Sequence, residues 1–394
     1  MNEVVIVGAA RTPIGRFKGV FAKVPATHLG AVAIRAALTR ANLDPHEVAE
    51  CLMDNVAHAG MEELLTQRAA QRAGLPPKIQ TGMLINKTGG SSLKTVAMAI
   101  ALIRNGEAEA VVAGGMENMS RGSQLVARTQ SGNQPPSENE DKSHEAAFWA
   151  SVEQQRVINS AESLARVHKV SRQQQDTYAF QSHRRAVAAQ QAGRFQAEIA
   201  PVEVPTGEGQ RSTLVDKDEL PQRELKLEAL ANLRTTLLPN GTVTSSNSCA
   251  PADGAAALVL MSRKRADALG LKPLARILDL AQSMVFSADV LTAPTIAVRR
   301  LLERAEREFN EFDLLEMDEL FAAQIIANGR ELDIDWKHLN IHGGTIALGH
   351  PIGASGSRSL VTLLYSLQHY QRKWGLVVVG AATGEALALA VERY

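Results

Sequence analysis

The sequence has few cysteines, few aromatic residues and no excess of either charge. Two cysteines in 394 residues are too few for a disulfide framework and favour a reducing compartment. Lys and Arg together number 42, as do Asp and Glu, so the chain lacks the basic excess of proteins that bind nucleic acid or acidic membranes. No apolar run reaches about 18 residues, the length of a membrane-spanning helix. The first residues, MNEVVIVGAARTP, predict a buried strand without a basic targeting region, so we expect a soluble, cytoplasmic protein with no nucleic-acid or membrane partner.

What the sequence does contain is a series of apolar and amphipathic segments. Ala, Val, Leu and Gly are abundant while aromatic residues make up 4%, as suits an α/β fold with close helix–sheet packing. Apolar runs over residues 4–7, 110–113 and 376–379 each end at glycine, which predicts strands covered on both faces, as in a parallel sheet. An amphipathic pattern over residues 27–40 predicts a helix. A chain of this length forms about two to three domains and needs no disulfide or metal to stabilise its core.

One pattern occurs twice. The stretches GGSSLKTVAMAIALIRNGEAEAVVAGG and ASGSRSLVTLLYSLQHYQRKWGLVVVGAA each contain a small-residue turn, an apolar-periodic helix and a Val-rich strand that ends in Gly. Ser92 and Ser357 occupy equivalent places in the two turns. The repeat predicts two similar α/β units packed in pseudo-symmetry. Two unrelated units that share a common α/β pattern are the alternative.

The middle of the chain differs in composition. Residues 121–145 are polar and rich in Gly, Pro, Ser and Asn, which predicts a long surface loop with a functional or interaction role. We expect a helix to begin at Ser160, and a second helix to begin at Ser171 with Gln174 in a capping box and to end at Gly193. Residues 253–262, DGAAALVLMS, return to the character of a buried strand.

Several long phrases of the chain, taken in order, resemble the thiolase family. They are VVIVGAARTPIGRFKG, AVVAGGMENMS, QSHRRAVAAQQAGRFQAEIAPVEV, NGTVTSSNSCAPADGAAALVLMS and NIHGGTIALGHPIGASG. The resemblance implies an α/β, thiolase-like fold of two pseudo-symmetric halves in layers, each a mixed sheet between helix layers, formed by residues 1–120 with 249–272 and by residues 273–394. It also implies an inserted loop domain, residues 121–248, that covers the coenzyme A site. A homodimer or homotetramer is expected.

The resemblance implies acyl-transfer chemistry, but the two family cysteines are replaced. The family phrase N-K-x-C-G-S-G-L-K carries the acyl group on its cysteine, and this chain reads NKTGGSSLK with Gly89 at that position. Glycine has no side chain with which to form a covalent intermediate. A second family cysteine moves a proton on the substrate α-carbon, and Gly380 stands there in GAATGEA. We therefore expect a divergent member that lacks both catalytic cysteines.

Two further positions of the family site carry ionisable groups. Where the family has an Asn that holds a water for the oxyanion site, the chain has Asp318, whose carboxylate would repel an oxyanion unless it is protonated or paired. His350, in the phrase LGHP, matches the family histidine that activates the nucleophile and donates to the thioester oxygen. Packing in a tight Gly-rich turn is the structural alternative for His350.

The resemblance also predicts the contacts to coenzyme A. The expected residues are Arg223, Ser246, Asn247, Cys249, Leu320 and Phe321. Cys249 stands where many relatives carry a serine, and its place in the fold argues against a role as replacement nucleophile. Cys51 is expected in the core. For Arg223, an ordinary exposed arginine is the alternative. A coenzyme A thioester is the expected ligand, with no tightly bound cofactor and no metal.

Two functions remain open at this point. The first is an acyl-CoA enzyme without a covalent acyl-enzyme, in which His350 polarises the thioester and Asp318 acts as a base. Direct acyl transfer, condensation, cleavage by water and decarboxylation are all compatible with it. The second is a catalytically silent subunit that pairs with an active paralogue, or a protein that only binds coenzyme A thioesters. A conventional acetyl-CoA acetyltransferase is what overall similarity suggests, and the residues at 89 and 380 argue against it.

Overall fold

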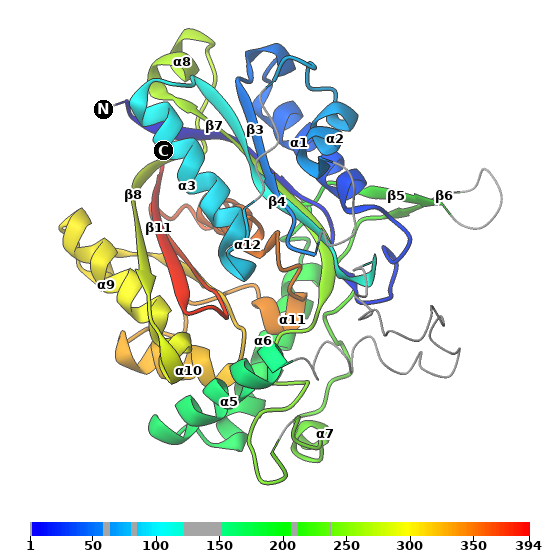
Figure 1. Ribbon diagram of the computed structural model, residues 1–394, viewed down its shortest axis with the longest axis vertical. Helices are drawn as coiled ribbons and strands as arrows, with labels where there is room; N and C mark the ends of the chain where they lie inside the picture. The colour runs from blue at the N-terminus through cyan, green and yellow to red at the C-terminus, as the bar shows by residue number, and fades with distance from the viewer. Residues whose placement is uncertain (1, 58–63, 80–84, 122–151, 206–211, 237) are drawn as a thin grey trace, which may run out of the picture.

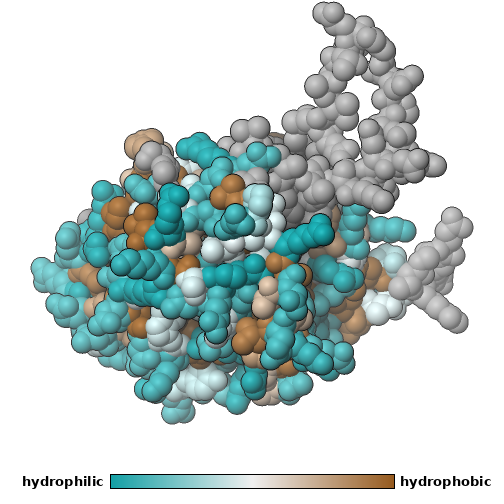
Figure 2. All heavy atoms as spheres, turned by 90° about the horizontal axis from the view of Figure 1, so that it is seen from below, coloured by the Kyte–Doolittle hydropathy of each residue, from teal (hydrophilic) through white to brown (hydrophobic). Residues whose placement is uncertain are grey.

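The structure is a computed structural model that describes residues 2–57, 64–79, 85–121, 152–205, 212–236 and 238–394. The loop predicted over residues 121–145 therefore lies outside the described residues except for Arg121. Within the described part of the chain, no helix is long and apolar enough to cross a membrane. The face shown in Figure 2 is mainly hydrophilic, with hydrophobic residues in small separate patches.

In the described part of the chain, nine strands form one large sheet in the order β3-β4-β7-β1-β8-β11-β10-β9, with β2 paired to β7. Their bounds are β1 Val4–Arg11, β2 Gly15–Arg16, β3 Glu50–Asp54, β4 Ala110–Asn118, β7 Ala252–Ser262, β8 Ala275–Met284, β9 Leu314–Met317, β10 Trp374–Gly380 and β11 Glu385–Arg393. The pairs β3–β4 and β9–β10 are parallel, and the other pairs are antiparallel. The sheet is therefore mixed, as the family resemblance implies, and the apolar runs reflect helices on both faces and not strand direction.

Helices cover the sheet in layers (Figure 1). The longer helices are α1 Ala26–Ala41, α2 Leu65–Ala73, α3 Ser91–Asn105, α5 Val152–Val167, α6 Arg172–Gln191, α9 Ala293–Ala305, α10 Ala322–Glu331 and α12 Ser355–His369. α1 and α2 share one core cluster with β1, β4 and β7, whereas α9 and α10 share another with β8, β10 and β11. α3 and α12 lie between these layers, in a core to which strands of both groups contribute.

The two copies of the predicted repeat pack against each other at the centre of the molecule. The backbone N–H of Ser357 in α12 donates to Ser92 Oγ in α3 at 3.0 Å. A Cβ on Gly356 would lie 2.8 Å from Leu93 Cβ, so glycine allows this close helix approach. Ser92 and Ser357, which mark the repeat in the sequence, therefore meet directly in the fold.

Two predicted strand ends are wrong for the same reason. β1 continues through Gly8 and β4 through Gly114. A Cβ on Gly8 would lie 2.3 Å from the Ala37 carbonyl oxygen of α1, and a Cβ on Gly114 would lie 2.1 Å from the Ala256 carbonyl oxygen of β7. Both glycines permit a close backbone contact inside a strand and do not end it.

The inserted segment contains helices where the sequence predicts them, with one error. The helix expected to begin at Ser160 is α5, which begins at Val152, and Ser160 Oγ donates to the Arg156 carbonyl oxygen inside it. α6 begins after Ser171 with the predicted capping box to Gln174, and Gly193, with φ of +68°, follows its end.

After α6, the described part of the insertion contains three short elements. It holds β5 Val202–Pro205, β6 Ser212–Val215 and α7 Leu227–Ala231, while α8 Arg263–Ala268 and α11 Thr345–Leu348 lie outside it. The whole segment connects β4 to β7, which pair with each other in the sheet. The domain bounds given above remain a prediction.

Candidate active site

Four chain segments converge at one point between the two groups of strands. A Cβ on Gly89, just before α3, would lie 3.0 Å from His350 Cε1, 3.3 Å from His350 Nε2 and 3.2 Å from the Gly380 carbonyl oxygen. Asp318 follows β9, and its Oδ1 lies 4.0 Å from His350 Nδ1. The structure therefore brings together Gly89, Asp318, His350 and Gly380, although they are far apart in the sequence.

His350 is buried and is held in one orientation. Its backbone N–H donates to the Ala250 carbonyl oxygen at 2.8 Å, and its Nδ1 lies 2.8 Å from Ser355 Oγ. Ser355 Oγ donates to the Pro351 carbonyl oxygen at 3.1 Å, so it accepts from Nδ1–H. In the tautomer that satisfies both contacts of Ser355 Oγ, Nδ1 carries the proton and the Nε2 lone pair is on the side of Gly89.

The charge state of His350 follows from its surroundings. Burial lowers the pKa of the imidazole below its ordinary value of 6.5, the Asp318 carboxylate acts in the opposite direction, and Arg358 lowers it further. The imidazole is therefore neutral near pH 7, and its open nitrogen can accept a proton there.

Asp318 is buried with one oxygen occupied and one free. Its Oδ1 accepts a hydrogen bond from Thr345 Oγ1 at 2.7 Å, and its backbone N–H donates to the Val378 carbonyl oxygen. Its Oδ2 is buried and has no hydrogen-bond partner among the described residues. A buried carboxylate oxygen without a partner is costly, so this atom is suited to a group brought by a substrate or water.

The neighbouring Glu319 is fully occupied. Its carboxylate accepts hydrogen bonds from Tyr178 Oη at 2.7 Å, Ser182 Oγ at 2.9 Å and Asn340 Nδ2 at 2.7 Å. Burial raises the pKa of Glu319. Glu319 thus ties the strand end that carries Asp318 to α6.

The turn before α3 is held by side chains that surround Gly89. Ser91 Oγ accepts from the Lys87 N–H at 2.9 Å and donates to the Thr88 carbonyl oxygen at 2.7 Å. Lys87 Nζ pairs with Glu385 Oε1 of β11 at 2.5 Å. Thr88 has φ of +46°, a left-handed conformation that is uncommon for a β-branched residue. Ser91 and Ser92 therefore build the helix start and its packing.

Neither cysteine has the surroundings of a reactive thiolate. Cys51 is fully buried in β3, and burial raises the pKa of its thiol to about 12, which confirms its predicted place in the core. Cys249 donates its backbone N–H to the Leu320 carbonyl oxygen at 3.0 Å. Burial and the nearby Asp318 carboxylate raise the pKa of the Cys249 thiol well above its usual range. A thiol held protonated in this way is a weak nucleophile.

Most residues predicted to contact coenzyme A form one local cluster. Residues 247–249 run beside residues 320–322, through the Cys249–Leu320 bond, a bridge between Ser248 and Phe321, and an Ala322 N–H that donates to the Asn247 carbonyl oxygen. Ser246 is half-buried beside them. Among the described residues, no hydrogen bond or ion pair joins the exposed Arg223 to this cluster.

The side chain of Asn247 has a structural task in this cluster. Its Nδ2 donates to Asp176 Oδ1 and to the Thr242 carbonyl oxygen, each at 3.0 Å, and its Oδ1 accepts from the Thr244 N–H. Any contact of Asn247 with a ligand would compete with these bonds. The assignment of coenzyme A contacts to this group of residues stays a prediction.

Sequence reasoning missed Ser355 and Thr345, which orient His350 and Asp318. Ser355 lies five residues after His350, and this short distance along the chain could have indicated a contact between the two side chains. Thr345 contacts Asp318 only because the fold brings two distant segments together. In the described ranges, no group of three or more His, Cys, Asp or Glu side chains is arranged to hold a metal ion.

Comparisons with known proteins agree along the whole chain. The family models described as the N-terminal and C-terminal domains of thiolase match residues 4–264 and 271–393. The chain is 40% identical over 394 residues to a protein of Pseudomonas aeruginosa named acetyl-CoA acetyltransferase, with 100% of both chains covered. It is 41% identical over 394 residues to a protein of the same name from Cupriavidus necator, again with 100% of both chains covered.

Solved structures give the same result for the fold. The acetyl-CoA acetyltransferase of Bacillus anthracis has a TM-score of 0.92 at 31% identity, covering 100% of this chain and 99% of that chain. Human mitochondrial 3-ketoacyl-CoA thiolase in complex with CoA has a TM-score of 0.91 at 32% identity, covering 100% and 98%. The predicted thiolase-like α/β fold is confirmed.

Proposed function

Because the chain belongs to the thiolase family, we propose that it is an acyl-CoA enzyme that transfers or cleaves the acyl group of a coenzyme A thioester without first attaching it to a cysteine. Relatives that match the whole chain are named acetyl-CoA acetyltransferases, which supports acyl transfer as the reaction class. The human relative whose structure contains CoA supports a coenzyme A thioester as the ligand.

The observation that carries the proposal is the direction of His350 Nε2. Its lone pair faces the space above Gly89, where a thiolase of the usual kind would carry its nucleophile. A neutral imidazole in that place can take a proton from a water molecule, or from an acidic C–H group of a carbon nucleophile. The water oxygen or the carbon then attacks the thioester carbonyl. The Asp318 carboxylate, 4.0 Å from Nδ1, then stabilises the imidazolium that forms.

This role differs from the one expected for His350 from the sequence. Polarising the thioester oxygen would need a proton on Nε2, whereas the Ser355 contact favours the proton on Nδ1. The buried Asp318 Oδ2, which has no partner among the described residues, is a second acceptor on the residue next to His350. Together these two acceptors support an active enzyme over a silent subunit, since a retired site has no need of either.

Mass spectrometry and turnover on the same samples test the proposal. The wild-type protein is incubated with acetyl-CoA, longer acyl-CoAs and 3-ketoacyl-CoAs, beside the variants His350→Ala and Cys249→Ala. We expect turnover in wild type and Cys249→Ala, a loss of about 100-fold or more in His350→Ala, and no acyl adduct on the protein. An acyl adduct on Cys249, or full activity of His350→Ala, would contradict the proposal.

The same preparation tests the remaining parts of the proposal. If wild type binds the acyl-CoAs but turns none over, and activity appears only with a cysteine-bearing paralogue, the chain is a partner subunit and the proposal is wrong. We also propose a homodimer or homotetramer and a cytoplasmic location. Light scattering on the purified protein and cell fractionation check these two points.

A further inference from the structure

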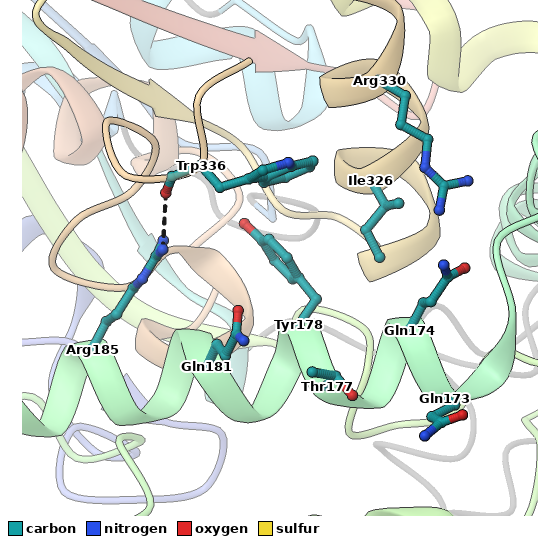
Figure 3. A pocket seen from close by; sticks show the side chains of 9 residues that line it. All are labelled: Gln173, Gln174, Thr177, Tyr178, Gln181, Arg185, Ile326, Arg330 and Trp336. Atoms are coloured by element: carbon teal, nitrogen blue, oxygen red, sulfur yellow. Dashed lines mark hydrogen bonds between the residues drawn. The ribbon is translucent and has the colours of Figure 1, made fainter. Parts of the chain in front are cut away.

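A cavity lies between α6 and α10, and Gly89, Asp318, His350 and Gly380 are not among its lining residues (Figure 3). Its volume is about 460 Å³, within the range of pockets that hold small molecules. One face of α6, two turns of α10 and Trp336 in the following segment line it. The cavity is therefore formed by regular elements and not by a loop alone.

One wall of the cavity is aromatic and aliphatic, and Gln173, Gln174, Thr177 and Gln181 of α6 form a polar side. The rings of Tyr178 and Trp336 lie edge to face, with centroids 6.0 Å apart and planes at 70°. Ile326 of α10 completes the apolar wall beside them (Figure 3). Such a wall offers ring faces and edges for a flat, unsaturated ligand body.

The two ends of the cavity carry positive charge. Arg185 and Arg330 lie at opposite ends of it in Figure 3. Arg185 donates to the carbonyl oxygens of Trp336 and Leu339, and Arg330 donates through Nη1 to that of His168. Both sets of partners are uncharged, and among the described residues neither guanidinium forms an ion pair with a carboxylate.

We propose that this cavity binds a small planar aromatic carboxylate. The ring would lie against Trp336, Tyr178 and Ile326, and the carboxylate would meet Arg330. Arg330 is preferred over Arg185 because it is exposed and has one N–H engaged, whereas both Nη atoms of Arg185 are bound to carbonyls. A planar guanidinium matches a carboxylate with two parallel hydrogen bonds.

The cavity is connected to the segment that carries Asp318 by one hydrogen bond. Tyr178 Oη donates to Glu319 Oε1 at 2.7 Å, and Glu319 directly follows Asp318 in the chain. A ligand that displaces the Tyr178 ring would therefore act on the residue next to Asp318. The binding proposal itself does not rest on the function proposed above.

Calorimetric titration with 2-naphthoate tests the proposal, performed on the full chain with saturating CoA so that the coenzyme A site is occupied. We expect one binding event, with 2-naphthamide, which has the same ring but no charge, binding about 10-fold or more weakly. Arg330→Gln should weaken the binding of 2-naphthoate by a similar factor. The matched control is Arg184→Gln, because Arg184 is an exposed arginine of α6 that lies against Phe180 and not in the cavity.

A second variant keeps the test decisive if Arg330→Gln loses stability along with its bond to His168. Gln181 is exposed, lines the cavity and can be replaced by Trp to fill it without removing an internal hydrogen bond given above. We expect Gln181→Trp to abolish 2-naphthoate binding. Absence of binding to wild type, equal binding of the amide, or unchanged binding to both variants would overturn the proposal.

Discussion

At residue 89, a single missing side chain separates this chain from one with a nucleophile beside His350. The Cβ of a residue there would lie 3.3 Å from His350 Nε2, so a thiol added to it would sit beside an imidazole lone pair. We expect Gly89→Cys to gain an acyl adduct when it is incubated with acetyl-CoA, because the imidazole can take the thiol proton. Intact-protein mass spectrometry reads the gain of one acetyl group directly.

Gly89→Ala is the control for this gain, since it adds the Cβ without a nucleophile. The wild type and Gly89→Ala should both remain unmodified. The contacts of the added Cβ at 3.0 Å to His350 Cε1 and 3.2 Å to the Gly380 carbonyl oxygen are tight. A small loss of stability is therefore expected in both Gly89→Cys and Gly89→Ala. A folded Gly89→Cys protein that forms no adduct would show that Nε2 does not act as a base toward this position.

The pH dependence of turnover belongs to His350 and Asp318. A general base works only when deprotonated, and burial lowers the pKa of His350 below 6.5, so kcat/KM should stay level at neutral pH and fall only as pH drops below 6.5. The Asp318 carboxylate raises the pKa of His350, so Asp318→Asn should move this fall to still lower pH. It should also lower the plateau by about 10-fold, because the imidazolium loses its stabilising charge.

A pH series of kcat/KM on wild type and Asp318→Asn checks the direction of the shift. Thr345→Val is the matched variant, since it removes the hydroxyl that bonds Asp318 Oδ1 and keeps the carboxylate. It should shift the profile less than Asp318→Asn does. A profile that moves to higher pH in Asp318→Asn would exclude the charge effect argued here.

At the scale of single elements, the contact between α3 and α12 depends on Gly356. Helix propensity alone would make Gly356→Ala stabilising by about 0.5–1 kcal/mol. The new Cβ, however, would lie 2.8 Å from Leu93 Cβ and 3.0 Å from the Leu93 backbone nitrogen. We therefore expect Gly356→Ala to lower the free energy of unfolding by about 1–3 kcal/mol, because the two helices must move apart.

Urea unfolding followed by circular dichroism measures this change. Ser92→Ala serves as the companion variant, since it removes the acceptor of the Ser357 N–H without adding volume. It should cost about 1 kcal/mol, the usual value for one hydrogen bond. A stabilised Gly356→Ala protein would mean that the helices adjust freely at this point.

Elements whose signals are local could be predicted from the sequence. The capping box of Ser171 and Gln174 and the apolar periodicity of residues 27–40 identify α6 and α1, because both depend on neighbours within a few residues. The predicted ends of β1 at Gly8 and of β4 at Gly114 are wrong. These glycines allow a close contact with Ala37 and with Ala256, which are far away in the chain. The pairing direction of each strand likewise depends on distant parts of the chain, and burial on both faces does not encode it.

The candidate site likewise contains residues that the sequence could predict and contacts that it could not. Gly89, Asp318, His350 and Gly380 could be found because they stand in family phrases, and the fold brings them together. The proton position on His350 could not be found, since it depends on Ser355 and on burial. The contact of Asp318 with Thr345 likewise required the fold.

At the scale of the whole molecule, the two groups of strands are joined weakly by the sheet and strongly by a shared core. Between β1 and β8 the register contains two residue pairs, Val5 with Arg276 and Ile6 with Ala275. The core around α3 and α12 contains buried side chains from both groups, such as Val111 and Leu258 on one side and Val377 and Leu389 on the other. The two groups therefore stabilise each other through α3 and α12.

This shared core predicts that residues 271–394 do not fold alone, although the family model of the thiolase C-terminal domain matches 271–393. In isolation α12 keeps its packing against β9 and β10 but loses its contacts with α3 and β7, including core side chains such as Leu93, Ile100 and Leu258. Each such side chain contributes about 1.5–3 kcal/mol when buried, and the loss of several exceeds the usual stability of a domain of this size. We expect the purified fragment to aggregate or to give a collapsed amide NMR spectrum, while the full chain unfolds in one transition with coincident fluorescence and circular dichroism. A monomeric fragment with a dispersed spectrum would show that the shared core is a contact between two independent domains.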